Sequence, residues 1–258
     1  TTVHTRDLAI AALKAQIDLA EEQEFFNSKL GLPHVVAGAR LNDSQIVECI
    51  GMYRKATHGT GFCTMGVDVG KWLHYEIDQW QATGVPSPDI NLTAQCKVLA
   101  EGKVLTFEEL DILMHDYKIT FCVIDANPEH RKALEFAQRF WGHVKLCYYG
   151  QGITNKVIHV HAPEEHTVTV DRTTWLDLSL GRFHKQRIAL PMDLSLEYKT
   201  HLKAPVRIYE KDKNGNADGR YVNGSNDDHF AHARNYAEIA LPLAIGVGTS
   251  SDIKAPVC

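Results

Sequence analysis

The sequence predicts an α/β protein whose central sheet is partly parallel. Short apolar runs with a strand pattern, such as 62–70 and 118–127, alternate with segments of helical spacing, such as 106–117. Strands separated by helices pair in parallel because the helix carries the chain back across the sheet. With 258 residues and 44% apolar side chains, the chain is long enough to bury the core that such a sheet needs.

The individual elements follow from local patterns. Residues 6–24 have helical spacing that ends at 31–33 (Gly-Leu-Pro), and Asn42 caps a short helix. Thr106 and Glu109 form a capping box for the helix at 106–117. The remaining main-domain elements are strands at 62–70, 71–81, 93–104, 118–127 and 143–149 and a helix that begins at Pro128.

The C-terminal third has a different pattern. It predicts a helix at 171–187, a hairpin at 204–224 with Asn-Gly and Asp-Gly turn signals, and a helix at 226–244 capped by Asn226. The predicted division of the chain is a helical lead-in or linker at 1–60, a main domain at 61–245 and a flexible tail at 246–258.

Composition excludes several classes of protein. No run approaches the roughly eighteen apolar residues of a membrane span, so no membrane partner is expected. The six cysteines form no CxxC pair, which indicates a reducing setting. The spacing of His159, His161 and His166 could suit zinc, but their strand-and-turn pattern and the lack of further ligands favour a structural interpretation.

Two apolar strands each end in an aspartate, Asp68 in MGVDVG and Asp125 in CVIDAN. A charge at the end of a buried strand is costly unless compensated, and ligands bind at the carboxyl ends of strands in open α/β sheets. The pair Asp227-Asp228 opens the last helix, where N-capping alone would also explain it. Carboxylates gathered together would select Mg²⁺ or Mn²⁺ over zinc, and two such ions would support phosphodiester hydrolysis.

Four segments in this order resemble the nuclease domain of the large terminase subunit of tailed bacteriophages. They are EFFNSKLGLP, MGVDVGKWLHYEI, CVIDANPEHRKALEFAQRF and NDDHFAHARNYAEIA. The resemblance implies an RNase H-like fold, with a mixed central β-sheet flanked by helices. It also implies a metal-dependent endonuclease that cuts double-stranded concatemeric viral DNA during genome packaging.

The resemblance implies a role for each matching residue. Asp68 would be the first metal ligand, Asp125 the second and Asp228 the third, while Asp227 would replace Asp228 or add to it. His232 would orient a carboxylate or a water. Of two Mg²⁺ or Mn²⁺ ions, one would activate a water and the other would stabilise the leaving 3′ oxygen.

The resemblance also implies partners. These are double-stranded DNA and, in the full-length protein, an ATPase domain, the portal and the small terminase, in the host bacterial cytoplasm. The chain lacks a GxxxxGK[ST] phosphate loop, so ATP hydrolysis is not expected of it. It is interpreted as a nuclease domain preceded by a helical segment that would follow the motor domain.

A net charge of −5 argues against nucleic acid only if the charges are evenly spread. Residues 171–220 carry a net charge of +3 and the remainder −8. Solvated cations at a helix end would explain part of this pattern. The predicted phosphate contacts are Arg182, Lys185, Arg187, Lys211 and Lys213.

Three alternatives stay open at this point. A resolvase or transposase would share the fold and the acids. A sugar-kinase or actin-like ATPase lobe could begin with a turn such as GVDVG, but it would need a second phosphate loop and tight ATP binding. A non-catalytic DNA-binding or motor-docking module would leave plasmid DNA intact with any metal.

Overall fold

The computed structural model describes residues 4–16, 19–32, 39–81, 87–150, 156–211, 217–223, 226–246 and 249–251. The strands are β1 Cys63–Val69, β2 Leu73–Gln81, β3 Gln95–Val104, β4 Phe121–Asp125, β5 Val144–Tyr149, β6 Ile158–Val160, β7 Thr167–Val170, β8 Ile188–Ala189, β9 Pro205–Lys211, β10 Ala217–Asn223 and β11 Thr249–Ser251. The helices are α1 Thr5–Lys14, α2 Leu19–Glu24, α3 Asp43–Glu48, α4 Ile90–Thr93, α5 Phe107–Asp116, α6 His130–Arg139, α7 Arg172–His184, α8 Leu196–Leu202 and α9 His229–Ile245, with a π-helical turn at Phe25–Lys29 and a 3₁₀ turn at Pro163–Glu165.

Within the described residues, one mixed sheet has the strand order β11-β6-β7-β5-β4-β1-β2-β3-β8. Strands β1, β2 and β3 form an antiparallel meander, whereas β4 and β5 continue from β1 in parallel. The predicted RNase H-like architecture, a mixed central sheet flanked by helices with a C-terminal hairpin, is therefore confirmed. Because β1 and β4 are parallel neighbours, their carboxyl ends meet at one edge of the sheet.

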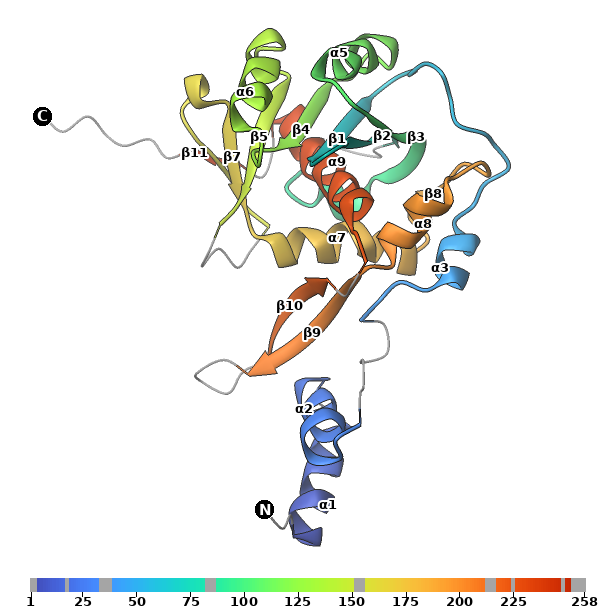
Figure 1. Ribbon diagram of the computed structural model, residues 1–258, viewed down its shortest axis with the longest axis vertical. Coiled ribbons are helices and arrows are strands. Elements are labelled where there is room, and N and C mark those ends of the chain that lie inside the picture. The colour runs from blue at the N-terminus through green and yellow to red at the C-terminus, as the bar shows by residue number, and fades with distance from the viewer. Residues whose placement is uncertain are drawn as a thin grey trace, which may run out of the picture.

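Helices cover both faces of the sheet (Figure 1). On one face, α5 and α6 pack on the apolar side chains of β1 and β4, including Met65, Val67 and Ile124. On the other face, α7 and α9 bury residues such as Trp175 and Tyr236 against Phe121. This alternation along β1 and β4 leaves Asp68 and Asp125 on the face that α9 covers.

Helix α9 lies unusually close to β1. A Cβ atom placed on Gly66 would come within 2.0 Å of the Ala233 carbonyl oxygen and 2.2 Å of the Ala237 amide nitrogen. The Thr64 hydroxyl donates to the Ala237 carbonyl oxygen at 3.0 Å in the same contact. Only glycine at position 66 allows the helix backbone to rest on the strand backbone.

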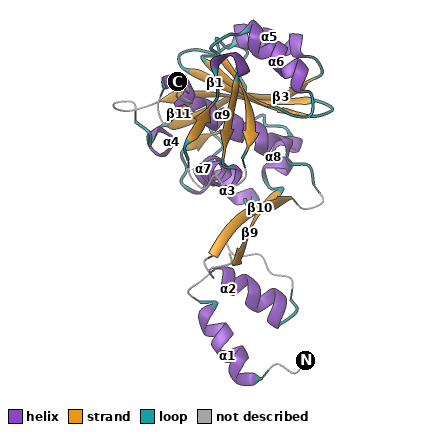
Figure 2. Ribbon diagram, turned by 90° about the vertical axis from the view of Figure 1, so that its left-hand side faces the viewer, coloured by secondary structure: helices purple, strands orange, loops and turns teal. Residues whose placement is uncertain are grey.

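The hairpin of β9 and β10 projects from the body toward the N-terminal helices (Figure 2). The Tyr209 amide donates to the side-chain oxygen of Gln23 on α2 at 3.2 Å. The predicted hairpin strands are present, while the turn at 212–216 lies outside the described residues.

Two segments outside residues 61–245 contact the main body. Within the 1–60 segment, Leu41 and Ile46 are buried in the core beside α7, so this part of the lead-in is packed into the main body. Within the 246–258 segment, Thr249–Ser251 pairs in parallel with β6 and extends the sheet, while 252–258 lies outside the described residues.

The predicted cap at Asn42 and the predicted capping box at Thr106 are both present, and Asn42 forms a capping box with Gln45 as well. The last helix begins later than predicted, because Asp228 and not Asn226 occupies its N-cap position. The five cysteines within the described part of the chain are free and buried. No helix among the described residues is long and apolar enough to cross a membrane.

Replacing Gly66 with alanine should destabilise the protein, because the new methyl group would force α9 away from β1. We expect a loss of about 3 kcal/mol or more in unfolding free energy, since overpacking against backbone cannot be relieved by a rotamer change. Urea denaturation followed by circular dichroism measures it.

Gly181 on α7 is the matched control for this substitution. A Cβ atom there would meet nothing within 4 Å. Gly181→Ala should therefore leave stability unchanged or raise it by up to about 1 kcal/mol. Equal effects of the two substitutions would contradict the proposed contact at Gly66.

Candidate active site

Asp68 lies one residue before the end of β1 and faces α9. Its neighbours Val67 and Val69 point into the core beneath α5 and α6. The carboxylate is 6% exposed, and its Oδ2 lies 2.8 Å from Nδ1 of His229. The negative charge of Asp68 is therefore buried where only groups on the first turn of α9 and at the ends of neighbouring strands can compensate it.

Asp125 is the last residue of β4 and lies beside Asp68. The parallel register pairs Val67 with Ile124, so the next residues of the two strands are neighbours at the same edge. Burial raises the pKa of Asp125 to about 6, and the negative charge of Asp68 adds to the rise although the Asn127 amide donates to the carboxylate. Two carboxylates that repel each other in this way form a place for a cation.

The two aspartates before α9 differ in exposure, because Asp228 is buried and Asp227 is exposed. Asp228 is 7% exposed, and its Oδ2 lies 3.0 Å from Nε2 of His232 and 3.9 Å from Nη2 of Arg172. Burial alone would raise the pKa of Asp228, but the adjacent His232 and Arg172 outweigh it and lower that pKa. Asp227 is exposed to solvent. Asp228 is therefore the buried member of the pair, in contact with His232 and near Arg172.

His232 connects the acidic residues to a buried polar network. Its Nδ1 lies 3.0 Å from the Tyr149 hydroxyl, which also accepts a hydrogen bond from Asn235 at 3.1 Å. Its other ring nitrogen is the one next to Asp228. His232 therefore contacts the Asp228 carboxylate through one ring nitrogen and the Tyr149 hydroxyl through the other.

Two histidines that the sequence patterns did not single out as ligands lie at this edge. His74 pairs with Asp68 across the β1–β2 ladder, and His229 is the first residue of α9. One ligand atom from each of Asp68, His74 and His229 lies within 4.8 Å of the others. The strand register opposite Asp68 could have indicated His74, once the tight turn between β1 and β2 was counted.

Arg172 is a further residue that the sequence did not single out from its basic segment. It begins α7, and its guanidinium lies near Asp228 and over the Tyr149 ring at 6.0 Å. It also donates to the Tyr221 carbonyl oxygen of β10 at 3.3 Å. The base of the hairpin therefore adjoins the candidate site.

The predicted phosphate contact at Arg182 is corrected by the structure. Arg182 is 2% exposed and makes two hydrogen bonds of 2.6 Å to the carboxylate of Glu238. It also donates to the carbonyl oxygens of Asn91 and Ala94. All of its hydrogen-bonding groups serve the core, so it cannot reach a DNA backbone.

The other predicted basic contacts do not meet at the site. Lys185 is exposed and Arg187 half-buried, and they follow the C-terminus of α7, about 20 Å along the helix from Arg172. The Arg187 carbonyl oxygen accepts from the Cys96 amide at the start of β3, which is the opposite edge of the sheet. The side chain of Lys211 and the whole of Lys213 lie outside the described residues.

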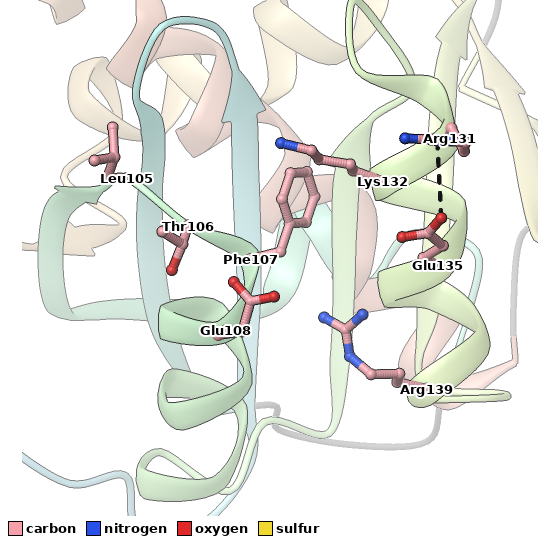
Figure 3. A pocket seen from close by; sticks show the side chains of 8 residues that line it. All are labelled: Leu105, Thr106, Phe107, Glu108, Arg131, Lys132, Glu135 and Arg139. Atoms are coloured by element: carbon pink, nitrogen blue, oxygen red, sulfur yellow. Dashed lines mark ion pairs between the residues drawn. The ribbon is translucent and has the colours of Figure 1, made fainter.

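A cavity of about 200 Å³ lies between α5 and α6, on the face of the sheet away from Asp68 (Figure 3). Its basic residues are already paired, Arg131 with Glu135 at 3.8 Å and Arg139 with Asp111 at 2.9 Å. The sheet separates this cavity from the carboxylates, and it contributes nothing to the candidate site.

Comparison with known proteins gives structural likenesses alone. No protein-family model and no curated protein sequence matches the chain. The magnesium-bound large terminase nuclease of thermophilic phage G20c shares 15% identity over 76% of this chain and 94% of its own, with a TM-score of 0.44. The cobalt-bound form of that nuclease gives 13% identity over 76% and 94%, with a TM-score of 0.42.

A longer large terminase from another thermophilic bacteriophage shares 11% identity over 91% of this chain and 52% of its own, with a TM-score of 0.42. These solved structures are of the class that the sequence motifs resemble. At identities of 11–16%, the functional conclusion has to come from the residues of the site.

Proposed function

We propose that this chain is a divalent-metal-dependent DNA endonuclease of the large terminase type, which cuts double-stranded concatemeric viral DNA during genome packaging. The observation that carries the proposal is that Asp68 and Asp125 lie at the carboxyl ends of neighbouring parallel strands, with Asp228 at the N-cap of α9, the helix that packs on β1. The proposal includes the ATPase domain, portal and small terminase as partners, and the host cytoplasm as the place of action.

The residues present fit hard divalent cations. Asp68 and Asp125 are neighbouring carboxylates with too little positive charge beside them, and Asp228 offers a third carboxylate on the same face. Carboxylate oxygens are the ligands that Mg²⁺ and Mn²⁺ prefer. Two ions held by these residues would activate a water and stabilise the leaving 3′ oxygen of a phosphodiester.

The protein's own groups prepare this edge for the reaction. The strands β1 and β4 fix Asp68 and Asp125 through backbone pairing, so their carboxylates need little reorganisation. His232, held by the Tyr149 hydroxyl, orients Asp228. Arg172 supplies a positive charge beside the site that would attract the phosphate backbone.

Lys71 is better placed for a DNA contact than the predicted Lys185. It is exposed in the turn between β1 and β2, three residues after Asp68. Trp72 in the same turn is 37% exposed and lies under the Lys103 ammonium at 5.6 Å. We include this turn in the proposed DNA-binding edge.

Plasmid nicking and linearisation should require Mg²⁺ or Mn²⁺ and stop with EDTA. Asp68→Asn or Asp125→Asn should reduce the cleavage rate by at least about 10³-fold, because a neutral amide cannot hold the cation. Gel electrophoresis of plasmid incubated with each protein measures the rate. Asp111→Asn, a carboxylate paired with Arg139 on the far face, is the control and should cut normally.

Intact plasmid with every metal would refute the nuclease proposal and favour a non-catalytic module. Tight ATP binding would instead favour the ATPase alternative, and preferential cutting of branched junctions would favour a resolvase.

Asp228→Asn should impair cleavage far more than Asp227→Asn. The Asp228 carboxylate is buried beside His232, whereas Asp227 faces solvent. We expect at least a 100-fold loss for the first variant and less than about 5-fold for the second, judged from the usual effect of removing a metal ligand and of a surface substitution. The reverse order would show that the outward residue is the ligand.

Lys71→Ala should weaken DNA binding, and Lys185→Ala should not. The loss of one phosphate contact should lower the slope of log affinity against log salt by about one. Fluorescence anisotropy with a labelled duplex, in the Asp125→Asn background that leaves the DNA uncut, measures both. If only Lys185→Ala weakened DNA binding, the duplex would have to bind at the opposite edge of the sheet.

A further inference from the structure

The candidate site contains nitrogen donors as well as carboxylates. His229 Nδ1 lies 2.8 Å from Asp68 Oδ2, and His74 stands opposite Asp68 in the antiparallel ladder. The His74 and His229 rings stack with centroids 4.6 Å apart and planes 9° apart. A third ring, that of His201 on α8, lies 5.7 Å from both.

His74 has a ring nitrogen without a partner. The residue is 4% exposed, and its Nδ1 is a buried polar atom with no hydrogen bond in the described structure. Leaving such an atom unpaired is costly, which indicates that a ligand completes the site.

A carboxylate lies near the other nitrogen of the same ring, beyond hydrogen-bond distance. His74 Nε2 lies 3.7 Å from Glu197 Oε1, and Lys103 fixes Glu197 with a contact of 2.7 Å. Metal-binding histidines commonly direct their second nitrogen to a carboxylate, which fixes the tautomer. Nδ1 of His74, which is buried without a partner, is then the nitrogen left for a metal ion.

We propose that Asp68, His74 and His229 form a site for a transition-metal ion, of the Zn²⁺, Co²⁺ or Mn²⁺ class, with Glu197 as the positioning carboxylate. The inference deepens the proposed function, on which it rests, because Asp68 belongs to both. Imidazole nitrogen is a ligand for these ions and a poor one for Mg²⁺, which takes oxygen ligands. The histidine side of Asp68 therefore favours these ions over Mg²⁺, whereas Asp68 and Asp125 together offer the oxygen ligands that Mg²⁺ takes.

The test is a titration of the ¹⁵N-labelled protein with Zn²⁺ and, separately, with Mg²⁺, followed through the histidine ring nitrogens by NMR. We expect Zn²⁺ to shift one ring nitrogen each of His74 and His229 and Mg²⁺ to leave the ring nitrogens of His74 unshifted. Calorimetry should give a Zn²⁺ affinity that falls by at least about 10- to 100-fold in His74→Asn and Glu197→Gln.

His166→Asn is the matched control for His74→Asn. His166 is 1% exposed and also has an unpartnered ring nitrogen, but it packs against Trp141 and is absent from the metal-ligating group. Asparagine suits its left-handed backbone. The His166→Asn variant should bind Zn²⁺ with the same affinity as the unaltered protein.

Unshifted nitrogens of His74 with Zn²⁺, or equal shifts with Mg²⁺, would overturn the inference even if His74→Asn fails to fold, since that measurement uses the unaltered protein. Mg²⁺-dependent plasmid nicking is read separately. Nicking without Zn²⁺-induced shifts refutes this inference alone, and Zn²⁺-induced shifts without nicking refute the proposed function alone.

Discussion

The position of α9 on β1 is the constraint on which the candidate site depends. Gly66 lets the helix backbone rest on the strand, and one turn further along the helix axis Asp228, His229 and His232 reach the sheet edge. A side chain at position 66 would lift the helix and separate these groups from Asp68. Backbone contact of this kind fixes a helix more firmly than interlocking side chains, since nothing in it can change rotamer.

Buried charges hold the same helix in register. Arg234 donates to Glu76 and also pairs with Asp78 and Glu238, all completely buried, and Arg182 completes the cluster. Burial raises the pKa of Glu76, and the charge of Asp78 adds to that rise. Two arginines, Arg182 and Arg234, therefore face the three carboxylates of Glu76, Asp78 and Glu238. Such a cluster contributes little net stability, but any shift of α9 would leave a buried charge unpaired.

How far the sequence predicts this protein depends on the range of each interaction. Local signals succeed: the Thr106 capping box, the strands ending at Asp68 and Asp125, and the hairpin all lie where they were expected. The predicted phosphate contact at Arg182 was wrong because basic residues near a helix end look solvated in sequence. The partner of Arg182, Glu238, lies 56 residues away along the chain. Ion pairs between residues far apart in the sequence leave no local sequence pattern that could predict them.

The same limit explains the histidines. His74 follows Asp68 by six residues, yet the two are neighbours only because the turn at 70–72 returns the chain directly opposite. Its closeness to His229 depends on α9, which is far along the chain. Strand periodicity indicated that Asp68 is buried, but the donor set around it is a property of the assembled sheet and helix.

Electrostatics connects metal and DNA at this edge. Asp68, Asp125 and Asp228 face few positive charges besides Arg172, so the edge alone repels a polyanion. A divalent cation removes that repulsion and adds attraction for a phosphate. In the proposed nuclease, cation binding and substrate binding are therefore thermodynamically coupled and reciprocal. The acidic balance of the chain is then no argument against a nucleic-acid substrate, because part of it is charge that the metal is meant to neutralise.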